Sequence, residues 1–172
     1  MAETRKAAIG LYFAHVVAER LRPLVPAGGR VLDFGDRRSA IALHLEAAGL
    51  MVVQDGESAP LGGAYAEVHD WSAVRNGATG LAARLAPGAP VLVRLERRAE
   101  QSAAVVARDL GPGFLWGSAK SLGFLVPPEA QSDWAERHPH AFAALCALEG
   151  LVRGWPGVRL AGREALLLGV RR

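Results

Sequence analysis

The sequence predicts a single α/β domain with a mainly parallel β-sheet and helices on both of its faces. Short apolar segments alternate along the 172 residues with segments of helical periodicity. Strands joined in this way pair in parallel, because a parallel connection has to cross over the sheet. The short strands are apolar at most positions, as in sheets that are buried on both faces. No repeat, low-complexity segment or linker divides residues 1–172, and the length fits one domain.

Composition narrows the class of protein further. Hydrophobic residues make up 51% of the chain and charged residues 22%, which excludes a disordered protein. The net charge is only +3, and the arginines are scattered without a run of five or six. We therefore predict no nucleic-acid partner.

Cysteine usage and the N-terminal segment bear on the compartment. Cys146 is the single cysteine, so no disulfide within the chain can form, as is usual in a reducing compartment. His15, Glu19 and Arg20 interrupt the apolar residues of the N-terminal segment, which excludes a signal peptide. No apolar run approaches the roughly 20 residues of a membrane span. We expect a cytoplasmic protein that does not associate with membranes.

The first half of the chain is expected to begin with an amphipathic helix over residues 4–21, which Pro23 ends. Ser39 is placed to cap a second helix, and Gly49 occupies its C-terminal end. Strands are predicted over residues 30–34, 50–53, 65–69 and 90–95.

The second half is expected to hold helices over residues 98–110 and 139–153, after a short one over residues 77–85. Residues 111–126 are rich in glycine and predict an irregular segment with a short strand at 122–126. Residues 158–161 and 165–170 predict two terminal strands. In the helix over residues 139–153 one apolar face is expected, with Leu148 beside it and Glu149 interrupting it; its members are Phe142, Leu145, Cys146 and Val152.

Five segments together match one known arrangement of motifs. They are PAGGRVLDFG at residues 26–35, GLMVVQD at 49–55, HDWS at 69–72, LAPGAPVLV at 85–93 and GREALLLGV at 162–170. In this order they resemble the first SAM-binding motif, the acidic tip of the second strand, the fourth-strand motif, the approach to the fifth strand and the last strand of class I SAM-dependent methyltransferases. The resemblance implies a Rossmann-like fold with S-adenosylmethionine (SAM) as cofactor.

The same resemblance implies a set of cofactor-binding residues, each with a structural alternative. Asp33 and Gly35 would lie at the methionine end of SAM, although Asp33 could instead cap a helix N-terminus. Asp55 or Glu57 would bind the ribose hydroxyls, or remain a solvated loop acid. Trp71 would flank adenine, or pack in the core.

His69 and Asp70 are the candidate catalytic residues, as a general base for methyl transfer to a small molecule. A base is needed only where the methyl acceptor carries a proton, and Asp70 could instead cap the helix that follows. The histidines near residue 139 lack a set of ligands with suitable spacing, so no metal site is predicted.

Three departures from the methyltransferase pattern affect the predicted cofactor site. Arg37 and Ser39 occupy positions where the pattern has glycines, so only Gly35 remains. Arg37 and Arg38 could instead hold an anionic ligand at the helix N-terminus. Only residues 56–64 separate Asp55 from the next strand, which is too short for a helix and a strand. We therefore predict that one βα unit is deleted. We also predict that residues 31–34 lie near the centre of the sheet and residues 51–53 at or next to an edge.

Two functions remain open from the sequence. The first is a SAM-dependent methyltransferase acting on a small molecule, and the second is a catalytically inactive methyltransferase-like subunit that binds a protein partner. A deleted unit bares a sheet edge, and bared edges are usually paired or covered. We therefore predict a homodimer or a hetero-complex through that edge or through the apolar segment 111–134.

Overall fold

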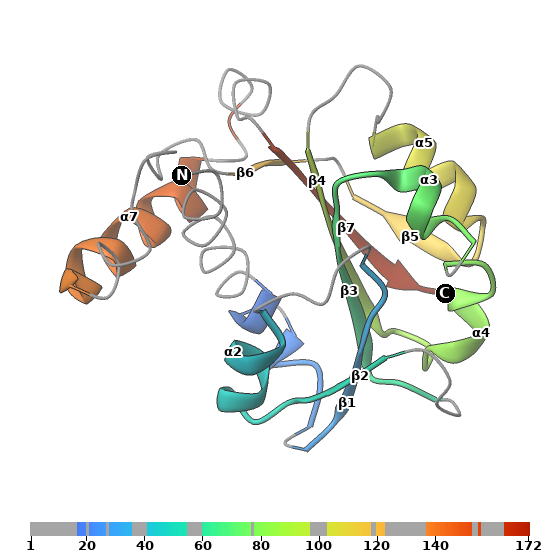
Figure 1. The fold of residues 1–172 in the computed structure, drawn as a ribbon, viewed down its shortest axis with the longest axis horizontal. Coiled ribbons are helices and arrows are strands. Elements are labelled where there is room, and N and C mark those ends of the chain that lie inside the picture. Colours follow the sequence, from blue (N-terminus) through green and yellow to red (C-terminus); the bar gives the residue numbers. More distant parts are fainter. Residues whose placement is uncertain are drawn as a thin grey trace.

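A computed structural model shows one sheet with helices on both faces (Figure 1). It describes residues 17–19, 21–26, 28–35, 41–54, 60–76, 78–96, 103–117, 120–122, 137–152, 155 and 164–172. The strands are β1 Arg30–Asp33, β2 Met51–Val53, β3 Gly63–Val68, β4 Pro90–Glu96, β5 Phe114–Trp116, β6 Lys120–Leu122 and β7 Glu164–Arg171. The helices are α2 Ile41–Ala47, α3 Trp71–Val74, α4 Leu81–Arg84, α5 Ala103–Leu110 and α7 Pro139–Val152.

The sheet has the order β2-β1-β3-β4-β7-β5, and β6 pairs with β7 as well. Strands β2, β1, β3 and β4 pair in parallel, whereas β7 runs antiparallel to β4, β5 and β6. The predicted fold class, an α/β domain with a mainly parallel sheet, is therefore confirmed.

The β2 edge of the sheet tests the predicted deletion. Among the described residues β2 pairs only with β1, which agrees with a missing βα unit. Residues 54–62 connect β2 to β3 across β1, a shorter path than the dozen or more residues of an ordinary parallel crossover. The expectation that residues 31–34 lie near the centre of the sheet was wrong. Strand β1 lies second from the edge, because the sheet grows on its other side by β7, β5 and β6.

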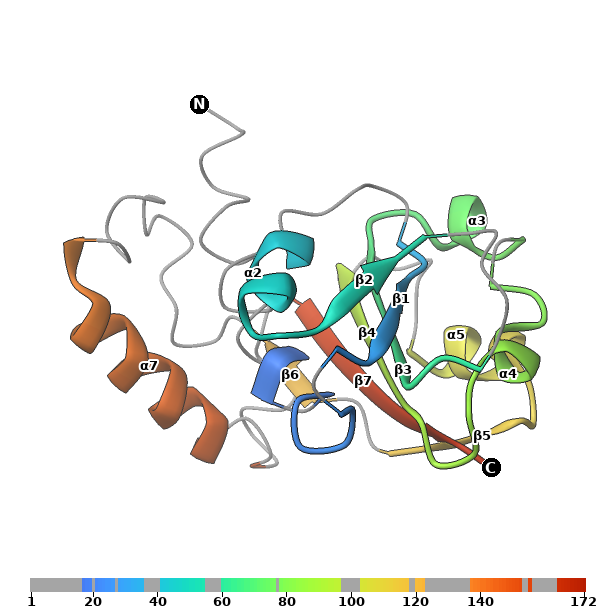
Figure 2. The same cartoon turned by 90° about the horizontal axis from the view of Figure 1, so that it is seen from below.

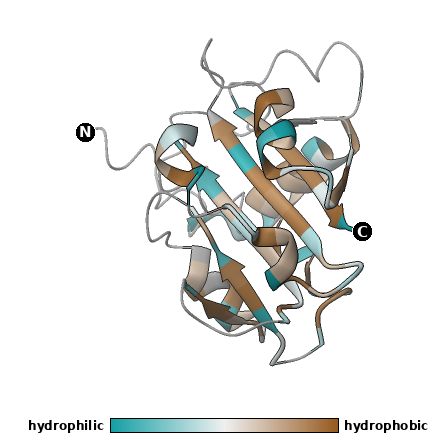
Figure 3. Cartoon of the chain, turned by 90° about the vertical axis from the view of Figure 1, so that its right-hand side faces the viewer, coloured by the Kyte–Doolittle hydropathy of each residue, from teal (hydrophilic) through white to brown (hydrophobic). Residues whose placement is uncertain are grey.

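Two hydrophobic cores fill the two sides of the sheet (Figures 1 and 2). One side, here called the α5 side, carries α3, α4 and α5, with Trp71, Leu81 and Val106 among its buried residues. The opposite side, here called the α7 side, carries α2 and α7. Neighbouring strand residues alternate between the two cores, as Val31 and Leu32 do. The strands are accordingly coloured mostly as hydrophobic segments in Figure 3.

Strands β5 and β6 form one interrupted strand along β7. Trp116 lies opposite Gly169 and Lys120 opposite Leu166, and the Gly117 N–H donates to the Leu168 carbonyl over 2.9 Å. A Cβ atom on Gly169 would lie 2.4 Å from the Trp116 ring, so this glycine lets the indole cover the strand. The strand expected at 122–126 overlaps β6 at Leu122, and residues 123–126 lie outside the described residues.

Four other predicted segments lie partly or wholly outside the described residues or differ from the observed elements. Residues 17–19 and 21 are helical, while the rest of the helix expected over 4–21 lies outside the described residues, as does the strand expected at 158–161. Helix α4 is shorter than the predicted 77–85. The described part of segment 111–134 pairs with β7, on the side of the sheet away from β2, and so does not cover the β2 edge.

Candidate cofactor site

Asp33 ends β1 at the carboxyl edge of the parallel strands. This is the edge at which open α/β sheets bind ligands. Its side chain is on the α7 side and only 8% of the residue is exposed. The Gly35 N–H donates a hydrogen bond to Asp33 Oδ1 over 3.1 Å, and the Tyr65 hydroxyl of β3 donates to Oδ2 over 3.0 Å. Both carboxylate oxygens are therefore oriented by the backbone and by the neighbouring strand.

Gly35 brings the loop after β1 against the backbone of β3. A Cβ atom at this position would lie 2.9 Å from the Glu67 carbonyl oxygen and 3.1 Å from the Glu67 nitrogen. Backbone atoms cannot yield as the end of a flexible side chain can, so the close approach requires glycine. The Phe34 N–H donates to the Tyr65 carbonyl over 3.1 Å and continues the β1–β3 pairing up to this loop.

A buried ionic triad lies on the same side and at the same edge. Arg94 of β4 is 4% exposed and binds Glu67 of β3 and Glu164 of β7, with 2.6 Å between Arg94 Nη2 and Glu164 Oε1. This triad was not predicted from the sequence. Two features could have indicated it: an arginine within the apolar strand 90–95 and a glutamate within the strand 65–69. Charged residues in buried strands are almost always paired.

Asp70 caps α3, as the structural alternative predicted. Its carboxylate accepts hydrogen bonds from the Ser72 N–H over 2.9 Å and from the Ser72 hydroxyl over 2.7 Å. His69, directly after β3, is partly buried. Its role as general base stays a prediction.

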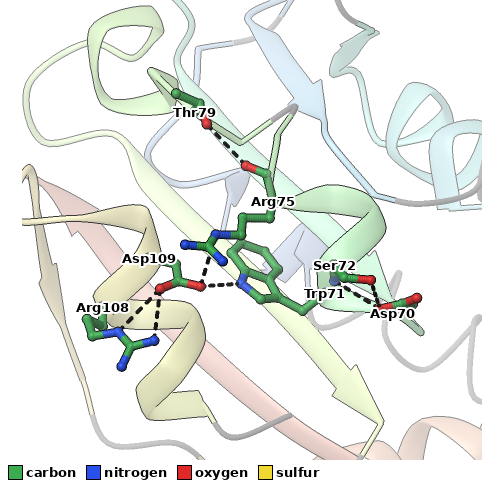
Figure 4. A network of polar contacts seen from close by, with 7 residues as sticks. All are labelled: Asp70, Trp71, Ser72, Arg75, Thr79, Arg108 and Asp109. Atoms are coloured by element: carbon green, nitrogen blue, oxygen red, sulfur yellow. Dashed lines mark hydrogen bonds and ion pairs between the residues drawn. The ribbon is translucent and has the colours of Figure 1, made fainter. Parts of the chain in front are cut away.

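Trp71 lies on the α5 side, across the sheet from Asp33. It is 5% exposed, and its indole N–H donates to Asp109 Oδ2 over 3.0 Å, which links α3 to α5. Arg75 and Arg108 also contact the Asp109 carboxylate (Figure 4). This environment is the one expected if Trp71 packs in the core. A contact between Trp71 and adenine stays a prediction.

The remaining predicted site residues cannot be placed. Asp55 and Glu57 lie outside the described residues, as do Arg37, Arg38 and Ser39. In the described part of the chain, no group of three His, Cys, Asp or Glu residues could hold a metal ion. None of the described helices combines the length and apolar character needed to cross a membrane.

Removing the indole N–H should make stability depend less on pH. The hydrogen bond from Trp71 is the main cause that lowers the pKa of Asp109, with smaller contributions from Arg108 and Arg75, and burial opposes them. A lowered pKa stabilises the fold above the ordinary pKa of the carboxyl, and this contribution is lost as pH falls through the folded value. In Trp71→Phe the pKa of Asp109 should rise, so the variant should lose more stability at neutral pH than in acid. Urea unfolding at neutral pH and at an acid pH, below the ordinary pKa of the carboxyl, measures the two losses of stability.

Trp116→Phe is the matched control, because the buried Trp116 Nε1 has no hydrogen-bond partner within the described structure. It should lose stability to the same extent at both pH values. Equal pH dependence in the two variants would contradict the assigned role of the Trp71–Asp109 bond.

Comparisons with known proteins agree on the fold. No family model matches the chain, and no curated protein matches it. A putative S-adenosylmethionine dependent methyltransferase from Listeria monocytogenes superposes with a TM-score of 0.51 and 10% identity, over 93% of this chain and 98% of that one. SMU.1697c, a putative methyltransferase from Streptococcus mutans in complex with SAH, superposes with a TM-score of 0.51 and 8% identity, over 91% and 95%. The chain has the Rossmann-like fold of the class I SAM-dependent methyltransferases.

Proposed function

We propose that this chain binds SAM at the carboxyl end of β1 and transfers its methyl group to a small molecule. The observation that carries the proposal is the Asp33 carboxylate, which the Gly35 N–H and the Tyr65 hydroxyl orient at this edge. Two solved structures of the same fold support it, since one is named a putative S-adenosylmethionine dependent methyltransferase and the other is a complex with SAH.

The described residues at this edge fit the methionine end of SAM. The Gly35 N–H and the Tyr65 hydroxyl both bind the Asp33 carboxylate. A carboxylate held in this way carries the charge that attracts an ammonium group. Gly35 has no side chain that would project toward a ligand at the loop.

We assign each residue a role in this proposed reaction. SAM would supply a methyl group on a sulfonium centre. Asp33 would hold the ammonium group, Asp55 or Glu57 would accept hydrogen bonds from the ribose hydroxyls, and His69 would take a proton from the acceptor. Asp70 is committed to capping α3, which leaves His69 as the candidate base.

A second candidate function is a non-catalytic subunit with the same fold. The observation that favours it is that polar groups near this edge are used inside the chain. The Trp71 indole is bound to Asp109, and the two carboxylates of the ionic triad bind Arg94. The shortened β2 edge agrees with either function.

Calorimetric titration with SAM and with SAH separates the two candidates. For an active methyltransferase we expect micromolar binding, roughly 8 kcal/mol. Asp33→Asn should weaken binding at least about tenfold, the cost of about one charge-assisted hydrogen bond. Asp55→Ala should also weaken it.

Asp109→Asn is the matched control, because Asp109 bonds Trp71 of the α5-side core. It should leave SAM binding unchanged. If well-folded protein gives no heat of binding at millimolar SAM, the non-catalytic candidate replaces the first. Equal losses in the two Asn variants would reject Asp33 as the cofactor ligand.

A further inference from the structure

The one charged residue of helix α7 is buried, and apolar residues are exposed on the same helix. It lies at the periphery of the α7 side in two perpendicular views (Figures 1 and 2). Residues 139–152 contain Glu149 and no Asp, Lys or Arg. Glu149 is 0% exposed, and Cys146, three residues before it, is 5% exposed within the core. Glu149 was expected to interrupt the apolar face of this helix, and it does lie on the buried face with Cys146.

A row of exposed apolar residues, here called the outer stripe, runs along α7 and ends at Trp155, three residues beyond the helix. Its members are exposed and follow one another at alternating spacings of three and four residues: Ala141, Ala144, Leu148, Leu151 and Trp155. Leu148 is 49% exposed, Leu151 74% and Trp155 62%. The Trp155 N–H donates to the Val152 carbonyl over 2.9 Å, which ties Trp155 to the end of the helix. This spacing is that of a two-helix seam.

We propose that the outer stripe is the seam of a homodimer, in which α7 of a second copy packs antiparallel against it. An isologous contact places one surface against itself about a twofold axis. With that axis at Leu148, Ala141 lies opposite Trp155, and Ala144 lies one residue, about 1.5 Å along the axis, from the level of Leu151. Small side chains thus meet large ones along the whole seam, and Leu148 meets its own copy. In a parallel pair the large residues would meet one another and the alanines would leave a gap.

The charge of the outer stripe agrees with a second copy as its partner. Charged residues are depleted from the core of an interface. The stripe has none, so the self-contact brings no like charges together. A partner with a charged surface would find no counter-charge on this face of α7.

The size of the outer stripe sets the strength of the dimer. A helix of 14 residues is about 21 Å long and roughly 10 Å wide. One such helix covers less than the roughly 800 Å² per partner of a standard interface, and contacts of this size belong to weak complexes. We therefore expect dissociation in the micromolar range and not an obligate dimer.

A membrane surface is the main competing occupant of the outer stripe. Helices that lie in a membrane interface carry lysines and arginines on their polar face. Residues 139–152 have neither, and their one carboxylate lies in the protein interior. Two copies of this chain fit the stripe better than a lipid surface.

Sedimentation equilibrium of the full chain tests the proposal. The unsubstituted protein should form dimers at micromolar concentration, and Leu151→Glu should weaken the dimer at least about tenfold by burying an unpaired charge. Leu43→Glu on α2 is the matched control, because Leu43 is 70% exposed and lies outside the outer stripe. It should dimerise like the unsubstituted protein.

Disulfide trapping tests the antiparallel arrangement. Leu148→Cys should cross-link to its own copy across the twofold axis under mild oxidation. Ala141→Cys should not, because antiparallel helices centred on residue 148 separate the two copies of residue 141 by about 21 Å. The native Cys146 should not interfere, because burial, with Glu149 and Glu19 nearby, raises its pKa to about 12 and keeps it a thiol.

Three outcomes would overturn the proposal. The first is a monomer at every concentration up to hundreds of micromolar, and the second is an equal loss of dimer in Leu151→Glu and Leu43→Glu. The third is a monomer that binds phosphatidylcholine vesicles unless Leu151 is replaced by Glu, which would assign the stripe to a membrane. A cross-link in Ala141→Cys would reject the antiparallel seam. All of these readouts are independent of SAM binding.

Discussion

Arg94→Met is expected to lower the free energy of unfolding by about 3–5 kcal/mol, the usual cost of removing one partner from a buried ion pair. The substitution leaves Glu67 and Glu164 facing each other's charge in the interior, with side chains that are 16% and 7% exposed. Such carboxylates lose both the attraction of the guanidinium and its hydrogen bonds, without regaining water. Urea unfolding at neutral pH measures the loss.

Two variants make this test specific. Arg108→Met removes a side chain that is 74% exposed and pairs with Asp109, so it should cost no more than about 1 kcal/mol. The triple variant Arg94→Met, Glu67→Leu, Glu164→Leu should recover most of the stability, because an apolar replacement of the whole triad leaves no buried charge. If Arg94→Met costs no more than Arg108→Met, the triad does not stabilise the sheet.

Gly35→Ala is expected to lower both stability and SAM affinity. The new methyl group would meet the Glu67 backbone at 2.9 Å, so the loop after β1 has to move away from β3. Overpacking of this kind costs about 1–3 kcal/mol. Because the same loop carries the N–H that orients Asp33, SAM binding should fall at least about tenfold. Urea unfolding and calorimetric titration measure the two effects.

Gly117→Ala is the control for Gly35→Ala. Its Cβ atom would make one contact, at 3.5 Å from the Leu168 carbonyl, which is an ordinary packing distance. Stability and SAM binding should both stay close to those of the unsubstituted protein. If the Gly35→Ala protein is destabilised but binds SAM with unchanged affinity, the cofactor does not bind at the loop after β1.

Local patterns in the sequence predicted five of the described strands and one helix cap. The apolar runs identified β1, β2, β3, β4 and β7, because a strand buried on both faces needs apolar residues at most positions. The short link before Gly63 predicted that β2 lies at or next to an edge, since nine residues leave no room for a further helix and strand. Among the described residues β2 pairs only with β1. Asp70 was a predicted cap because its bond to Ser72 spans only two residues.

Such local patterns did not predict contacts between residues that are distant in the sequence. Trp71 and Asp109 are 38 positions apart, and Arg94 and Glu164 are 70 apart. Periodicity in one strand does not say which residue of another strand will lie beside it. The role of Tyr65 as a hydrogen-bond donor to Asp33 was missed for the same reason, because it depends on the β1–β3 register.

The sequence by itself determined that the chain forms a shortened α/β sheet with Asp33 at the end of its first strand. The hydrophobic pattern of a strand and the length of a connection depend only on residues that are neighbours in the sequence. Only the tertiary structure decided which apolar residues stay exposed. In helix α7 the predicted face with Phe142 and Cys146 does pack in the core. The other apolar residues surround the helix, so the sequence alone did not determine which of them would stay exposed. In the folded chain Glu149 is buried and Leu151 is 74% exposed. The packing of α7 decided that difference, because both residues lie in the same helix.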